Sequence, residues 1–305
     1  MVNQFIGPSL NLAHVAQLKA RALVSSNRGA DSLEECLLLL KLADLRAFPT
    51  LIEHLVRTTK ITLLMPVLYE AVSQHVWSDA QLAAIEQRLA VYDLLGDLRQ
   101  CFEAETLFSR GLNDGVQSGK VSAETFAAMF SPLNFSSRSS VEKALPMWIP
   151  KTLSNILCSG ALDAAVQRVG VLSNRFDLRL RDRTGPIDLH WGPLNPIAGL
   201  ISSALDGVLK KTARVQSLVN IARVAIALER HRLKHGSLPP TLEELVPAFL
   251  SAIPNEVFDG APLHYVLRND GQAFTLYSTG WKGTDDGGAT DYSKLDQTNW
   301  TWGSP

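Results

Sequence analysis

A run of residues between positions 199 and 236 constrains the fold of this chain more than any other feature. Within it, apolar side chains recur every three or four residues, which is the spacing of one face of an α-helix. Gly236 follows a basic stretch and is the kind of residue that ends a helix in the left-handed conformation. At about 1.5 Å per residue, the run predicts a helix that is more than about 50 Å long.

The chain before this run also has helical periodicity, from residue 10 to about residue 135. Two segments open with the spacing of a capping box, Ser32 to Glu35 and Ser78 to Gln81. Pro49 stands at the expected first turn of another helix, in which Pro66 predicts a kink or break. No fixed repeat is apparent, so we expect helical hairpins rather than a solenoid.

The last third of the chain changes from a helical to a strand period. After a short expected helix at 241–250, the segments "PLHYVLR" and "AFTLYST" predict two strands, with "NDGQ" as the hairpin turn between them, and "TNWTW" predicts a third. Segments 131–150 and 173–196 are rich in Ser, Pro or Gly and predict irregular loops. The expected fold is therefore mainly α with a small α+β C-terminal module, divided into an α-helical domain at 1–195 and the module at 196–305.

Composition excludes several classes of protein. The 29 basic and 30 acidic residues are spread along the chain, which argues against binding to nucleic acid. The three cysteines are far apart and lack metal or redox spacing, so we expect buried thiols. The sequence predicts no transmembrane segment, because no apolar stretch reaches about 18 uncharged residues. The start "MVNQF" also lacks the pattern of a signal peptide, so the compartment stays unknown from these features.

Motifs that would specify a reaction are incomplete. "DGVQSGKVS" lacks the first Gly and the final Ser or Thr of a phosphate-binding loop. His231 and His235 are one helical turn apart, but Arg232 stands where a zinc protease has Glu, which favours a solvated basic helix end. A catalytic site assembled from distant residues leaves no such motif, so enzymatic activity stays open.

The stretch "GTDDGGATD" at 283–291 concentrates Asp and Gly near the end of the chain. These residues suit a sharp, solvated turn, and their oxygens also suit a cation such as calcium. The spacing matches neither an EF-hand nor a calcium-binding β-helix repeat, so it favours the turn.

A family resemblance covers residues 215–302. In order, "LERHRLKHGSLP", "TLEELVPAFL", "FTLYSTGWKGTDDGG" and "DQTNW" resemble the periplasmic part of the major pseudopilin of type II secretion systems. They resemble more closely bacterial proteins of unknown function that fuse such a module to a helical region. The resemblance implies a long spine helix packed on a small antiparallel sheet, with a calcium-holding loop between the last strands.

Applied residue by residue, the resemblance assigns Asp285, Asp286, Asp291 and Asp296 as candidate calcium ligands or loop-closing acids. Lys282 departs from it, because the family usually has Asp at that position. A lysine ammonium there would pair with the acids in place of the metal. The membrane helix and leader of a pseudopilin are not found at the start of this chain.

Three functions follow as hypotheses. The first is a noncatalytic bacterial structural or protein-interaction protein, with an unidentified protein partner and, by resemblance, a place in the cell envelope or periplasm linked to secretion. The second is a cytosolic α-helical adaptor that binds peptides in an apolar groove within residues 30–112. The third is a hydrolase with a spatially assembled site at His54, Asp188 or His190.

Overall fold

The computed structural model describes residues 3–45, 49–121, 195–258, 260–281, 283–288 and 299–302. Its α-helices are α1 (Asn3–Ser25), α2 (Gly29–Asp44), α3 (Leu51–Ser73), α4 (Asp79–Ala90), α5 (Leu94–Gln117) and α10 (Asn195–His235). Its strands are β1 (His264–Arg268), β2 (Ala273–Ser278) and β3 (Trp300–Trp302), with short 3₁₀ turns η4 (Leu242–Leu245) and η5 (Asn269–Gly271).

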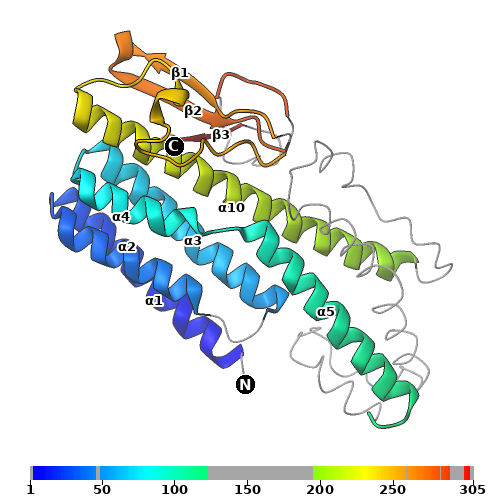
Figure 1. Ribbon diagram of the computed structural model, residues 1–305. Helices are drawn as coiled ribbons and strands as arrows, with labels where there is room; N and C mark the ends of the chain where they lie inside the picture. The colour runs from blue at the N-terminus through cyan, green and yellow to red at the C-terminus, as the bar shows by residue number, and fades with distance from the viewer. Residues whose placement is uncertain are drawn as a thin grey trace.

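The first helices pack side by side and bury their apolar faces together (Figure 1). The turn between α1 and α2 spans only residues 26–28, which reverses the chain and makes a helical hairpin. Helix α3 packs against both, and α4 covers α2 and α10. This arrangement agrees with the helical hairpins predicted from the periodicity.

Helix α10 lies between the other helices and the sheet (Figure 1). One of its faces, which includes Val215, Val219 and Ile226, belongs to a hydrophobic cluster with α1 to α4. Another face, which includes Ile221 and Leu228, belongs to a second cluster with α5, η4 and the sheet. The long helix predicted at 199–236 is therefore confirmed as a central element with two apolar faces.

The three strands form an antiparallel sheet in the order β1-β2-β3. The hairpin turn falls at the predicted "NDGQ", where Asn269, Asp270 and Gly271 all have positive φ. Strand β2 pairs with β1 from Ala273 to Tyr277 and, within the described residues, with β3 from Leu276 to Ser278. The predicted fold class, mainly α with a small antiparallel sheet near the C-terminal end, is confirmed.

Several local predictions were wrong. Ser32 does not cap a helix, because α2 begins three residues earlier at Gly29. Helix α3 continues through Pro66 without a break, and the helix expected at 241–250 is only the 3₁₀ turn η4. In contrast, Ser78 and Gln81 form the predicted capping box at the start of α4.

Some predictions fall outside the described residues or remain predictions. The loop expected at 131–150 and nearly all of that at 173–196 lie outside them, and the domain boundary at 195/196 stays a prediction. Cys36 and Cys101 are buried free thiols, as predicted, whereas Cys158 lies outside the described part. Among the helices that the structure describes, none is both long and apolar enough to cross a membrane.

Candidate functional site

A cleft of about 620 Å³ lies between α3, α10 and the sheet. Its size falls in the range of ligand-binding pockets in proteins. Residues from distant parts of the sequence line it: Tyr69, Val72, Ser73, His75, Glu229, Arg232, Leu238, Gln272–Thr275, Asp286–Gly288, Thr301 and Trp302. The cleft is thus built jointly by the helical region and the C-terminal segment.

A buried carboxylate anchors the polar end of the cleft. The Glu229 side chain is only 5% exposed and accepts two hydrogen bonds from Arg232, at 2.6 Å on Oε1 and 2.7 Å on Oε2. The Nδ1 atom of His75 lies 2.9 Å from the same Oε1. Hydrogen bonding to Glu229 raises the pKa of Arg232, so the guanidinium is firmly charged. Both oxygens of Glu229 are therefore occupied by neighbouring donors.

His75 reaches Glu229 because of an unusual backbone conformation. It follows the end of α3 with φ of 55°, in the left-handed region that glycine normally occupies at a helix end. Its N–H donates to Val72 O and the next N–H, of Val76, donates to Ala71 O, which closes the last turn. A side chain in this conformation costs about 1–2 kcal/mol. The contact with Glu229 compensates part of that cost.

Another part of the cleft lining is aromatic and apolar. Tyr69 of α3 and Trp302 of β3 meet edge to face with ring centroids 5.6 Å apart. Val72 and Phe274 lie beside them in the lining. Such aromatic surfaces bind apolar or aromatic side chains of a ligand.

The Asp-Gly stretch folds over the sheet and forms one wall of the cleft. Asp285 Oδ1 accepts hydrogen bonds from the Tyr277 hydroxyl and from the N–H of Gly287, both at 2.9 Å. Its Oδ2 lies 3.5 Å from His264 Nδ1. These contacts, with the Gly287 N–H as the largest, hold the pKa of Asp285 below its usual value. Asp285 therefore acts as a turn-closing acid.

Asn299, which comes after this loop in the sequence, also holds it closed. Its Oδ1 accepts from the N–H groups of Asp286 and Gly288, and its Nδ2 donates to Thr284 O and Thr279 O. The hydroxyl of Thr301 donates to Gly288 O. Two main-chain oxygens of this loop, those of Thr284 and Gly288, therefore accept hydrogen bonds from protein side chains.

The predicted calcium ligands divide between described and undescribed residues. Asp285 and Asp286 are close neighbours in the loop, whereas Asp291, Asp296 and Lys282 lie outside the described residues. Within the ranges that the structure describes, no group of three acidic, His or Cys side chains is arranged to hold a metal. The resemblance to a calcium loop thus stays a prediction, and the described part shows a loop held by hydrogen bonds.

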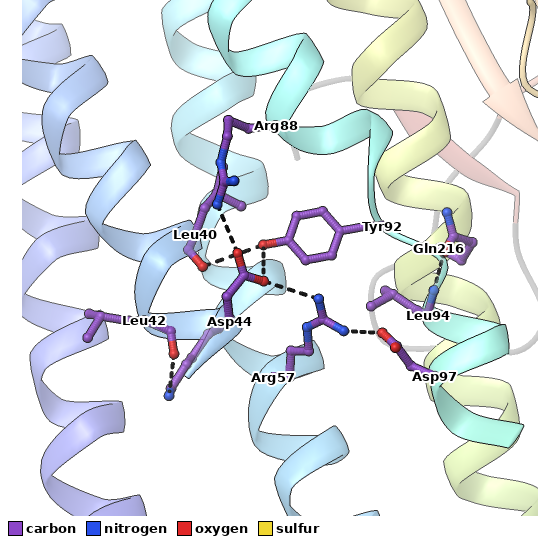
Figure 2. Close-up of polar contacts among 10 residues, drawn as sticks. Leu40, Leu42, Asp44, Arg57, Arg88, Tyr92, Leu94, Asp97 and Gln216 are labelled. Atoms are coloured by element: carbon purple, nitrogen blue, oxygen red, sulfur yellow. Dashed lines mark hydrogen bonds and ion pairs between the residues drawn. The ribbon is translucent and has the colours of Figure 1, made fainter. Parts of the chain in front are cut away.

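A second polar cluster lies within the helical layer, away from the cleft (Figure 2). Asp44, at the end of α2, accepts from Arg57 at 3.1 Å, from Arg88 at 2.9 Å and from the Tyr92 hydroxyl at 3.0 Å. Arg57 also pairs with Asp97 of α5. The cluster joins α2, α3, α4 and α5, and its charges are neutralised by one another. Its role is structural.

Of the residues predicted for a spatially assembled hydrolase site, the structure describes His54, which does not line the cleft. His54 is buried and lies 2.9 Å from the Thr212 hydroxyl of α10, while Asp188 and His190 are outside the described residues. The solvated basic helix end is confirmed at Lys234 and His235, which are exposed, but not at His231, which is buried with its Nδ1 2.9 Å from Ser237 O.

Sequence reasoning missed His75, Glu229 and Arg232 as a group. Comparisons of the chain with protein-family models, with curated proteins and with solved structures found no match. The candidate site therefore rests on the geometry of the cleft.

Proposed function

We propose that this chain is a noncatalytic protein-interaction protein with a pseudopilin-like C-terminal module, and that the cleft is where it binds a protein partner. The carrying observation is that both the helical region and the C-terminal segment line this one cleft. If the C-terminal segment only covered the apolar surface of the helical region, it would not need to form a concave surface together with α3.

The chemistry of the cleft supports binding. Both carboxylate oxygens of Glu229 already contact Arg232 or His75, so Glu229 serves to hold these two side chains in place. The aromatic pair Tyr69 and Trp302 supplies a rigid apolar surface, and such residues often dominate the binding energy of protein interfaces. Charged and aromatic side chains in one lining together suit a polypeptide ligand.

Resemblance to the major pseudopilin supports a place in the cell envelope, linked to secretion. A cytosolic peptide-binding adaptor is the alternative that uses the same cleft, whose α3 wall falls within residues 30–112. Fractionation of the cells that produce the protein separates the two, because only the first predicts recovery with the envelope.

Site-specific photocrosslinking in those cells tests the interaction. A photoreactive residue at Ser73, which lines the cleft, should capture a defined protein. The matched control is Ser25, because each is the exposed last residue of its helix, α3 or α1. Capture of the same proteins from both positions, or of none from Ser73, would contradict the proposal.

One observation favours a hydrolase as a second candidate. A carboxylate that contacts Nδ1 of a histidine is the arrangement that orients an imidazole as a general base. This candidate predicts hydrolysis of p-nitrophenyl acetate that falls at least tenfold in His75→Gln. Our proposal predicts that both proteins hydrolyse the ester at the same background rate.

A further inference from the structure

We infer that the outer face of α1 is an interface at which two copies of this chain pack antiparallel to each other. This inference goes beyond the proposed function, since the described lining of the cleft includes no residue of α1.

The first step is that α1 is apolar on two opposite faces. Its inner face packs on α2 and α3 through buried alanines, Ala13, Ala16 and Ala20. Its outer face carries Leu12, Val15 and Leu18, which are 48%, 60% and 64% exposed. Figure 1 shows this helix at the edge of the helical layer, away from the sheet. Apolar residues on opposite faces are typical of a helix that is covered on both, so the outer face indicates a binding surface.

The second step is the spacing of the exposed apolar residues on the outer face, which are Pro8, Leu12, Val15, Leu18 and Ala22. Successive members are four, three, three and four residues apart, so the pattern is the same in both directions from Val15. A two-fold axis at Val15 places Leu12 of each copy against Leu18 of the other, and Pro8 then meets Ala22 in the same way. Such reciprocal contacts define a symmetric dimer interface. The spacing therefore fits a second copy of the same helix.

The third step is the charge beside this face. Lys19 and Arg21 are the cations of α1, which contains no Asp or Glu, and they pair with Glu35 of α2 and Glu70 of α3. Because both cations already have a carboxylate partner, they offer little attraction to an acidic peptide or an anionic membrane. A parallel pair of helices would bring the two Lys19 side chains together. An antiparallel pair keeps them apart, because each lies four residues from Val15 toward a different end.

The fourth step is the size of the interface. One helix from each copy makes an interface at the low end of the sizes of specific protein interfaces, below about 1,200 Å². We therefore expect a reversible dimer with a dissociation constant in the micromolar range.

Sedimentation velocity of the full chain tests the inference across this concentration range. Native protein should change from monomer to dimer as its concentration rises. Val15→Glu places two carboxylates at the axis and should raise the dissociation constant at least tenfold. The matched control is Val91→Glu, because Val91 is a similarly exposed valine at the end of α4, and this variant should stay within twofold of native protein. Circular dichroism checks that both variants are folded.

A mixture of Leu12→Glu with Leu18→Lys tests the orientation, because an antiparallel pair brings these two side chains together. The control mixture is Leu12→Glu with Leu12→Lys, in which an antiparallel pair sets each charge against a leucine. With one protein of each mixture fluorescently labelled, we expect the first mixture to form mixed dimers at least fivefold more tightly than the second.

The inference is overturned if native protein stays monomeric, if Val15→Glu dimerises as well as native protein, or if the two mixtures have equal affinities. Two measurements on a monomeric protein would identify what covers the face instead. Binding to vesicles of phosphatidylglycerol and phosphatidylcholine that Val15→Glu abolishes would assign the face to a membrane. Labelling of Val15→Cys by a maleimide that is at least tenfold slower than labelling of Val91→Cys would assign it to a segment of this chain outside the described ranges. Capture of a partner from Ser73 tests the proposed function separately from all these outcomes.

Discussion

At the scale of single residues, Asn299 shows how one buried side chain can organise a whole loop. Its amide contacts four main-chain groups, at Thr279, Thr284, Asp286 and Gly288. Asparagine suits this position because its side chain offers both donors and acceptors. The loop therefore depends on the "TNW" sequence that follows it as much as on its own aspartates.

Asn299→Ala should lower the free energy of unfolding by about 2–4 kcal/mol, because buried main-chain groups lose their partners. Urea denaturation measures this change. Asn299→Asp keeps the acceptor for Asp286 and Gly288 but turns a carboxylate oxygen toward the carbonyls of Thr279 and Thr284, so its loss should be at least as large. Asn11→Ala on the exposed face of α1 is the control and should change stability by less than about 0.5 kcal/mol. Equal stability of Asn299→Ala and Asn11→Ala would show that the loop is held by other contacts.

Tyr92 makes the helical layer sensitive to alkaline pH. Burial first, and then the carboxylate of Asp44, raise the pKa of its hydroxyl above the ordinary value. In the unfolded chain the hydroxyl loses its proton near pH 10, whereas the folded protein retains it. The hydroxyl's contribution to the free energy of unfolding is therefore complete below about pH 10. Above that value it falls by at most about 1.4 kcal/mol per pH unit, until the pKa of the folded state is reached.

Tyr265 and Tyr277 also have raised pKa values. They affect the pH dependence of stability equally in native protein and in Tyr92→Phe, so the difference between the two proteins reports Tyr92 alone. We expect the unfolding free energy of Tyr92→Phe to fall less steeply between pH 10 and pH 11, as measured by urea denaturation at each pH. Parallel slopes for the two proteins would contradict the assignment.

At the scale of elements, helix signals in the sequence succeeded where no tertiary contact competes with them. Ser78 caps α4 as predicted, because its side chain is exposed and free to bond Gln81. Ser32 has the same local pattern, yet its hydroxyl accepts the indole N–H of Trp77 at 2.9 Å inside α2. That partner is 45 residues away, so no local pattern could reveal it.

The Asp-Gly loop is the element whose metal dependence can be measured directly. Since its described oxygens accept hydrogen bonds from Asn299, Thr301 and other protein groups, we expect the thermal midpoint of the native chain to be the same in calcium and in a chelator. Lys282→Asp introduces the acid that the resemblance predicts at that position and should acquire a calcium-dependent rise of a few degrees.

The control for calcium is magnesium at equal concentration, because its smaller size and strict geometry make such a loop a poor site for it. A calcium response in the native chain would instead assign the predicted aspartates as ligands. No response in either protein would leave the stretch as a solvated turn.

At the scale of the whole molecule, the sequence predicted the elements better than the site. The apolar period of α10 and the turn at "NDGQ" are local patterns, and both were confirmed. His75 and Glu229 are 154 residues apart, so their contact has no local signature. One signal was present, because Glu229 interrupts the apolar period of α10, and a buried charge in that position requires a partner.

The two faces of α10 also determine how the molecule should unfold. Leu218 and Trp302 pack against both hydrophobic clusters, so neither cluster can lose α10 without exposing part of the other. We therefore expect one cooperative urea transition across the described chain, despite the predicted boundary at 195/196. Fluorine NMR of protein labelled with 5-fluorotryptophan can follow it, since Trp77 lies in the first cluster and Trp300 in the second.

Two matched variants test whether the two hydrophobic clusters unfold together. Leu64 of α3 and Leu276 of β2 are both fully buried, one in each cluster. Replacement of either by Ala should cost about 2–5 kcal/mol and should shift the Trp77 and Trp300 signals to the same lower urea concentration. If Leu276→Ala moved only the Trp300 signal, the C-terminal module would be a separate folding unit. A shared shift would mean that α10 couples the cleft walls, so that loss of either cluster abolishes the binding site.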